Sequence, residues 1–199
     1  MTSVTPTDDA ETDAEAETDG VPSHEHRIPR PRRVGLFVAV ATAALGLDIL
    51  SKLLVVANLE SRQSPDRILG GAIYLDVARN SGAAFSLGTG FTIVLTLIAA
   101  AVVLIILRTA SRMRSIGWAV ALGLVLGGAL GNLVDRVFRS PGVGRGHVVD
   151  WISAFGPNGQ HWPIFNIADS AICCGAVLAV ILALRGTDMD GTTARDDRG

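Results

Sequence analysis

The fold class follows most directly from residues 164–184, which read IFNIADSAICCGAVLAVILAL. An α-helix of this length spans roughly 30 Å, which is the thickness of the hydrocarbon core of a bilayer. Three more apolar runs of similar length occupy about residues 34–57, 88–107 and 116–134. Hydrophobic residues make up 49% of the chain and charged residues only 18%, which is typical of membrane proteins. We therefore expect an all-α polytopic membrane protein with four transmembrane helices.

The arginines predict the orientation of these helices. Four precede the first helix, three lie in the short link after the second, and one follows the fourth: Arg27, Arg30, Arg32, Arg33, Arg108, Arg112, Arg114 and Arg185. By the positive-inside rule these segments are cytoplasmic, and the longer loops, about 58–87 and 135–163, lie outside the cell membrane. Residues 1–33 are acidic and then basic, so we expect a disordered cytoplasmic tail. The transmembrane domain then covers residues 34–185, and residues 186–199 form a second cytoplasmic tail.

Two aspartates stand among apolar residues, where a membrane protein normally avoids charge. Asp169 lies in the last helix, about one and a half turns from its outer end, with no lysine or arginine at helical spacing. Asp150 lies in the second outer loop, where its apolar neighbours press against the membrane. Intramembrane acids are candidates for functional sites because burying a charge is costly. We expect Asp150 and Asp169 to meet at the outer boundary between membrane and water.

Two adjacent carboxyl groups cannot both ionise readily, so one of them keeps a proton. The ionised carboxylate can act as general base toward water while the protonated one polarises a scissile carbonyl, which is peptide hydrolysis without an acyl-enzyme. The residues alone leave alternatives open. A proton-coupled transporter would use acids near the membrane midplane and an internal repeat, and a non-catalytic scaffold would tolerate their replacement. A metal site built from His147, Asp150 and His161 lacks the paired spacing of known motifs.

Other polar and small residues of the helices have structural interpretations. Asp48 and Lys52, the only lysine, are spaced i, i+4, which predicts an intrahelical ion pair with the lysine reaching toward the outer interface. Asp135 and Arg136 end the third helix together with Asn132, and this pair either caps the helix or holds substrate. The same helix carries a stripe of small residues that predicts close helix packing: Gly123, Gly127 and Gly131.

Five short blocks, in order along residues 35–185, carry a resemblance to a known family. They are Asp48-Ile-Leu-Ser-Lys52, Asn80-Ser-Gly-Ala-Ala-Phe85, Gly131-Asn-Leu-Val-Asp-Arg136, Val148-Val-Asp-Trp-Ile152 and Phe165-Asn-Ile-Ala-Asp-Ser170. In these blocks the chain resembles the lipoprotein signal peptidases, the bacterial signal peptidase II family. The resemblance implies a membrane aspartyl endopeptidase that cleaves prolipoproteins before a diacylglyceryl-modified cysteine. Trp151 stands where the family more often has phenylalanine, a mild departure.

The resemblance also implies roles for individual residues. Asp150 and Asp169 match the catalytic pair of the family, and the supporting positions are matched by Asp48 and Asp135. Positions that line the substrate site are matched by Asn80, Gly82, Asn132, Arg136 and Asn166. The family fold implies a small extracytoplasmic β-rich platform and a short surface helix from about residues 58–87, where Ile73-Tyr-Leu-Asp-Val77 alternates as a half-buried strand does. We expect a monomer that has prolipoproteins and membrane lipids as partners, with no cofactor, metal or nucleic acid.

Overall fold

The structure is a computed structural model that describes residues 31–62, 64–82 and 90–192. Four of its helices are long and apolar enough to cross a membrane. They are α1 (Val34–Leu59), α2 (Gly90–Thr109), α3 (Ile116–Phe138) and α4 (Ile167–Leu184). Most of the large side chains that they leave exposed are leucine, isoleucine and valine, as lipid-facing surfaces require. The predicted class of a four-helix membrane protein is therefore confirmed.

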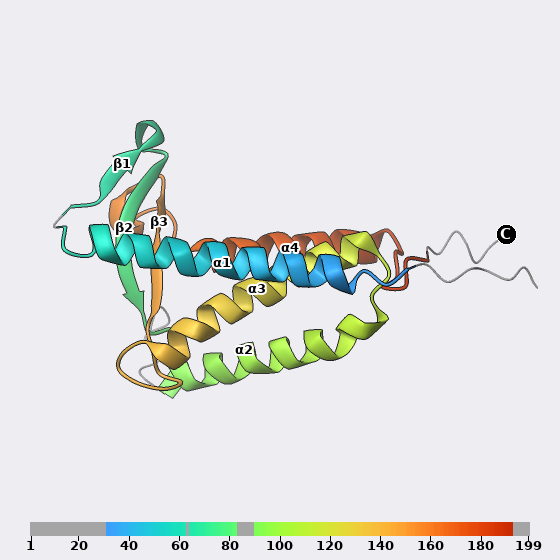
Figure 1. The fold of residues 1–199 in the computed structure, drawn as a ribbon. Coiled ribbons are helices and arrows are strands. Elements are labelled where there is room, and N and C mark those ends of the chain that lie inside the picture. Colours follow the sequence, from blue (N-terminus) through green and yellow to red (C-terminus); the bar gives the residue numbers. More distant parts are fainter. Residues whose placement is uncertain (1–30, 63, 83–89, 193–199) are drawn as a thin grey trace, which may run out of the picture.

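Helix α3 is the centre of the bundle and packs against the other three helices. In Figure 1, α1 and α4 run along one side of α3, and α2 leans away on the other side. Glycines make the close approach to α1 and α4 feasible. A Cβ atom on Gly127 would lie 2.5 Å from the carbonyl oxygen of Ala41, and a Cβ on Gly123 would lie 3.0 Å from that of Phe37. The glycine stripe thus serves backbone packing, as the spacing predicts.

A small antiparallel sheet stands at one end of the bundle, which we call the platform end (Figure 1). Its strand order is β1-β2-β3, with β1 at Asp66–Ile68, β2 at Ile73–Asn80 and β3 at Val148–Ala154. Short 3₁₀ turns at Leu69–Gly71 and Pro157–Gly159 complete this platform. The strand predicted at residues 73–77 is β2, and the β-rich platform is confirmed. Within residues 58–62 and 64–82, the described part of the predicted loop, no surface α-helix follows the end of α1.

The prediction that the second outer segment is a loop was wrong in one respect, because this segment supplies the third strand of the sheet. Ala78 pairs with Asp150 and Asn80 pairs with Val148 across β2 and β3, so Asp150 lies in a sheet and not in a loop. The segment between the two helices is also shifted along the chain, from about 135–163 to 139–166, since α3 continues to Phe138 and α4 starts later than predicted. An isolated bridge between Ile152 and Phe165 holds the residues before α4 in extended form, and α4 begins only at Ile167.

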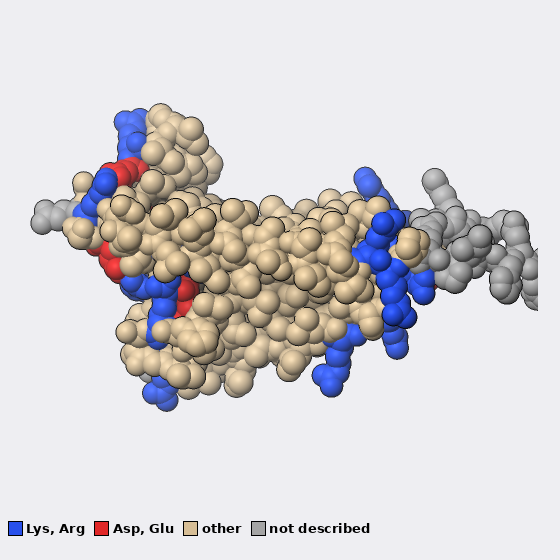
Figure 2. Space-filling view, in the orientation of Figure 1, with Lys and Arg blue, Asp and Glu red and all other residues tan. Residues whose placement is uncertain are grey.

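On the face shown in Figure 2, charged side chains gather at the two ends of the molecule, and the surface between them shows neither acidic nor basic residues. On the face shown, acidic side chains are seen only at the platform end, whereas the opposite end carries arginines. We call this opposite end the arginine end; it contains the start of α1, the link between α2 and α3, and the end of α4. Of the two predicted tails, residues 1–30 and 193–199 lie outside the described residues.

Candidate active site

Asp150 lies in β3 at the platform end, and its side chain is only 3% exposed. Asn80 on the neighbouring strand donates to its Oδ2 at 2.8 Å, and Asn166 donates to its Oδ1 at 2.7 Å. Burial raises the pKa of the Asp150 carboxyl from 3.8 to about 6. The hydrogen bond from Asn80 opposes this rise in pKa, and the negative charge of Asp169 adds to it. Asp150 is therefore a carboxyl group that can gain or lose a proton near neutral pH.

Gly82 fixes the side chain of Asn80. Its backbone N–H donates to Asn80 Oδ1 at 2.7 Å, which leaves the amide group of Asn80 pointing at Asp150. The φ angle of Gly82 is +83°, a conformation that residues with a side chain rarely adopt. Glycine is thus required here by the turn that follows β2. The rest of this sequence block, Ala83-Ala-Phe85, lies outside the described residues.

Asp169 lies in the first turn of α4 and not one and a half turns inside it. Asn166 is the N-cap residue: its Oδ1 accepts from the Asp169 N–H at 2.9 Å, and its own N–H donates to Asp169 Oδ2 at 3.2 Å. This reciprocal arrangement is a capping box, which fixes the residue at which the helix begins. The aspartate is therefore half-buried at the edge of the apolar segment, closer to the platform than its predicted depth.

Asn166 joins the two aspartates. Its side chain is fully buried, and its Nδ2 reaches Asp150 while its Oδ1 and backbone N–H hold Asp169. A single residue thus contacts both carboxyl groups, and the negative charge of Asp169 raises the pKa of Asp150. The structure brings Asp150 and Asp169 together at the platform end of the bundle.

Lys52 holds a buried polar cluster beneath the two aspartates. Its ammonium group lies 2.7 Å from Asp48 Oδ2, 2.9 Å from Asp135 Oδ2 and 3.1 Å from Asn132 Oδ1. The predicted pair with Asp48 is present, but the predicted reach of Lys52 toward the interface is wrong, because its side chain is 1% exposed. Asn132 and Asp135 on α3 bind the ammonium group of Lys52 and so keep its positive charge inside the bundle.

Asn132 connects this cluster to the pair of aspartates. Its Nδ2 donates to Asp169 Oδ1 at 2.8 Å, and its Oδ1 accepts from both Lys52 and Asn166 at 3.1 Å. Because the ammonium group of Lys52 can only donate, it fixes which end of the Asn132 amide faces Asp169. Lys52 thereby orients the hydrogen bond that Asp169 receives.

Asp48 and Asp135 hold backbone elements in place around the site. Asp48 on α1 accepts from the N–H of Ala168, in the first turn of α4, at 2.9 Å. Asp135 accepts from the N–H of Val149, next to Asp150 on β3, at 3.2 Å. The ion-pair partners of Asp135 are Lys52 and Arg139.

Arg136 adds a further positive charge to the site, and no ion pair with it is seen among the described residues. Its guanidinium interacts electrostatically with Asp150 and Asp169, and its buried Nη1 has no hydrogen-bond partner among the described residues. A cleft of about 460 Å³ opens beside Asp150 between the platform and the segment before α4; Asn80, Ser81, Pro163 and Ile164 are among its lining residues. The site therefore combines two carboxyl groups, a nearby cation with a free donor, and space for a ligand.

Sequence reasoning missed two features of this site. It treated Lys52 as a surface-directed partner of Asp48 alone, although a single lysine within an apolar helix already indicates inward partners. It also placed the start of α4 too early, although Asn166 and Asp169 have the N-cap and N3 spacing of a capping box. Within the described part of the chain, no group of three histidine, cysteine, aspartate or glutamate residues is arranged to hold a metal ion.

Comparison with known proteins gives a consistent set of relatives. A family model described as signal peptidase (SPase) II matches residues 40–185. A lipoprotein signal peptidase of Streptomyces coelicolor is 53% identical over 83% of this chain and 78% of its own length. One of Rhodococcus jostii is 50% identical over 94% of this chain and 92% of its own. A bacterial membrane enzyme solved by the in meso method at 1.9 Å resolution has a TM-score of 0.68 and 26% identity, covering 80% of this chain and 99% of that structure.

Proposed function

Because the chain belongs to the signal peptidase II family and is therefore a membrane protease, we propose that it is an aspartyl endopeptidase of prolipoproteins. It cleaves the peptide bond before a diacylglyceryl-modified cysteine, with a water molecule activated by Asp150 and Asp169. The observation that carries this proposal is the double contact of Asn166, which caps Asp169 and donates to Asp150. The Asn166 side-chain amide holds the Asp150 carboxyl and the Asn166 backbone N–H holds the Asp169 carboxyl, so one buried residue positions the two as a pair that can share a proton.

The charges around the pair favour a single shared proton. Asp48 and Asp135 are balanced by Lys52 and Arg139, so this cluster is neutral by itself. Arg136 then balances one negative charge on the pair, which is the charge of two carboxyl groups that keep one proton between them. Full ionisation would leave an uncompensated charge at a largely buried site, which is unfavourable.

The reaction follows from this protonation state. The ionised carboxylate removes a proton from water as the water oxygen attacks the scissile carbonyl, and the protonated carboxyl donates a hydrogen bond to the carbonyl oxygen. Transfer of a proton to the amine nitrogen then breaks the C–N bond and returns the pair to its starting charge. Arg136 stabilises negative charge that develops on the carbonyl oxygen, because its Nη1 has a free donor. Base and acid belong to the pair as a unit, since its two titrations are coupled.

The surroundings of the pair suit a substrate with acyl chains in the bilayer. The site lies where the apolar helices meet the platform, and the platform exposes large apolar side chains, among them Leu69, Phe155 and Trp162. We propose that these side chains rest in the headgroup region, so that a lipid-anchored peptide reaches the cleft from the side. Water is available at this boundary, whereas the bilayer core would exclude it.

The proposed orientation places the arginine end in the cytoplasm and the aspartate pair at the outer face of the cell membrane. The collected arginines at one end support this orientation by the positive-inside rule. Both termini are then cytoplasmic, as expected for an even number of membrane crossings. The platform faces the compartment into which prolipoproteins are exported.

A matched pair of precursor peptides tests the proposed substrate. Both carry the same sequence around one cysteine, and only one of them carries the diacylglyceryl group. The purified full-length protein in detergent should cleave only the modified peptide, and mass spectrometry should find the modified cysteine as the new N-terminus. Equal cleavage of both peptides, or a cut at another bond, would overturn the proposed specificity.

A further inference from the structure

Arginines gather at the end of the bundle that is remote from the aspartate pair, on the face shown in Figure 2. We call this set the arginine collar; its described members are Arg32, Arg33, Arg108, Arg112, Arg114 and Arg185. Two described acids lie nearby in sequence, Asp188 and Asp190, and Asp190 accepts hydrogen bonds from Thr192. The collar therefore carries a clear excess of positive charge, and the proposed peptidase reaction does not use it.

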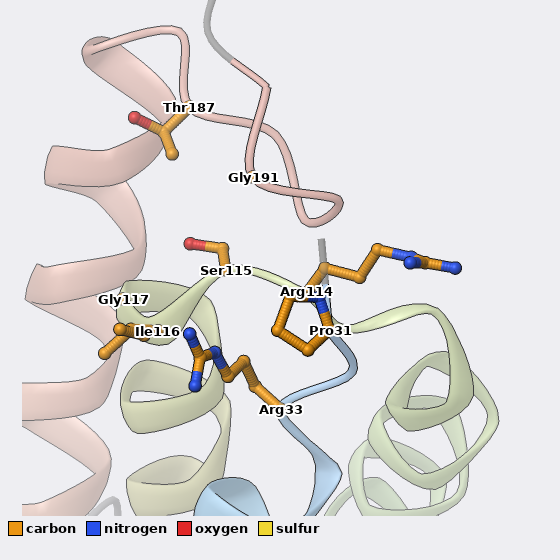
Figure 3. Close-up of a pocket in the computed structure, with 8 residues that line it drawn as sticks. All are labelled: Pro31, Arg33, Arg114, Ser115, Ile116, Gly117, Thr187 and Gly191. Carbon is orange, nitrogen blue, oxygen red and sulfur yellow. The ribbon is translucent and has the colours of Figure 1, made fainter. Parts of the chain in front are cut away.

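A cavity of about 330 Å³ lies inside the arginine collar (Figure 3). Three segments form it: the residues before α1, the start of α3, and the turn after α4. Backbone hydrogen bonds join these segments, since Arg33 N donates to Met113 O at 2.9 Å and Ser115 N donates to Met189 O at 3.0 Å. The indole N–H of Trp118 also donates to Thr187 O at 2.7 Å. The cavity is thus part of the fold rather than a gap between loose ends.

The cavity presents donors and positive charge to a ligand. Arg33 extends toward Ser115 and Ile116 in Figure 3, and its buried Nε has no hydrogen-bond partner within the described ranges. Arg114 lines the opposite side, and its side chain points away from that of Arg33. The first N–H groups of α3, at Ile116 and Gly117, border the same space and lack intrahelical acceptors. An anionic group in the cavity would give an acceptor to Arg33 Nε and to the first N–H groups of α3.

The position of the cavity relative to the membrane indicates which anion it accepts. Ile116 lines the cavity and is 55% exposed, and exposed leucines stand within three residues of lining residues on the neighbouring helices, Leu36 after Arg33 and Leu184 before Thr187. In a spanning bundle, such side chains face acyl chains, so the cavity lies where hydrocarbon gives way to headgroups. A phospholipid can place its phosphate in the cavity while its acyl chains follow these side chains. A free phosphate ion would gain nothing from the apolar wall.

We propose that this cavity binds the headgroup of an anionic phospholipid from the adjoining leaflet. Arg33 holds the phosphate from inside the cavity, and the remaining arginines of the collar attract the negative membrane surface. Basic pockets between transmembrane helices on the cytoplasmic side are a recurrent form of lipid recognition. The lipid joins the start of α1, the start of α3 and the turn after α4, so it stabilises the end of the bundle that the peptidase site does not reach.

Thermal unfolding of the full-length protein in neutral detergent tests the proposal with three probes: phosphatidylglycerol, phosphatidylcholine and inorganic phosphate. Phosphatidylglycerol should raise the Tm as its concentration increases, because a ligand bound only by the folded state stabilises it. Phosphatidylcholine and inorganic phosphate should leave the Tm unchanged. A Tm increase of the same size with either of these two probes overturns the proposal, and this comparison needs no variant.

Two variants locate the binding. Arg33→Gln removes the arginine inside the cavity, and Arg108→Gln removes a collar arginine that does not line it. Arg33→Gln should weaken phosphatidylglycerol binding about fivefold, which corresponds to about 1 kcal/mol for one arginine near an anionic membrane. Arg108→Gln should weaken it far less, and both variants should retain peptidase activity as evidence of folding. Equal losses in the two variants would show general attraction to the collar and would overturn the assignment to the cavity.

Discussion

Replacement of Lys52 by methionine should strongly destabilise the protein. Within the described part of the chain, the ammonium group is the only cation paired with Asp48, which would keep just the hydrogen bond from Ala168 N–H. Asp135 would keep Arg139 and the N–H of Val149. Removal of one partner of a buried ion pair leaves an uncompensated charge and costs about 3–5 kcal/mol. At about 2–4 °C for each kcal/mol in a chain of this size, the Tm should fall by roughly 6–20 °C.

A second substitution shows whether Lys52→Met destabilises the protein through the unbalanced charge of Asp48 or through the lost packing of the lysine side chain. In the double variant Lys52→Met, Asp48→Asn, the orphaned charge is gone, and the asparagine oxygen can still accept from Ala168 N–H. The double variant should therefore be more stable than Lys52→Met alone, so the two substitutions should be non-additive. Thermal unfolding of wild type and both variants in one detergent at one pH measures this. A loss below about 1 kcal/mol for Lys52→Met, or a double variant less stable than the single one, would refute a buried ion cluster centred on Lys52.

Three further predictions concern the pair and the helix packing. Burial raises the pKa of Asp150 to about 6 and the mechanism needs one proton on the pair, so kcat/KM should fall as the pH rises above that value. Asn80→Ala removes a hydrogen bond that stabilises the ionised form of Asp150, so it should raise this pKa and move the fall in kcat/KM to higher pH. Arg136→Gln should lower kcat by about 10²-fold with little change in Tm, and Arg136→Lys should restore part of it. Gly127→Ala should cost about 1–3 kcal/mol of stability, because its Cβ would meet the backbone of α1.

Each of these predictions has a result that would contradict it. A kcat/KM that stays level between pH 6 and 8 would contradict the proposal that the pair shares one proton. A fall in kcat/KM that Asn80→Ala moves to lower pH would contradict it as well. An Arg136→Gln variant with normal turnover would exclude a role in charge stabilisation. For the glycine, Gly46→Ala is the matched control, since a Cβ at that helical position meets nothing within 4 Å. Equal effects of the two glycine substitutions would argue against close packing at Gly127.

The sequence predicts the membrane class well because hydrophobic length is a local property. An apolar run of about 20 residues has few alternatives to a spanning helix. The platform strand β2 is likewise visible as local alternation. The strand β3 was not expected, because Val148, Val149, Trp151 and Ile152 read as a membrane-facing apolar loop until the partner strand is known. Pairing of Ala78 with Asp150 connects residues far apart in the chain, and no local pattern encodes that register.

In the candidate site, too, local features were predictable from the sequence and long-range contacts were not. Asp150 and Asp169 stand out in the sequence because each is an acid among apolar residues without a local partner. The identity of the inward partners of Lys52 could not be derived in the same way, since helix periodicity identifies only its i, i+4 neighbour Asp48. Its contacts with Asp135 and Asn132 arise only when the glycines of α3 allow α1 to approach. Long-range helix packing, and not helix periodicity, decides which charges meet inside the bundle.

The central claim is that Asp150 and Asp169 together activate water, and the most direct measurement is cleavage of a diacylglyceryl-modified prolipoprotein peptide by single variants. Asp150→Asn and Asp169→Asn are compared with Asp66→Asn, which changes an exposed aspartate of β1 paired with Arg62. All three should fold, as judged by Tm, and Asp66→Asn should cleave at the wild-type rate. The account predicts that Asp150→Asn and Asp169→Asn each lose at least about 10²-fold in rate. Cleavage by either variant at the wild-type rate would contradict it.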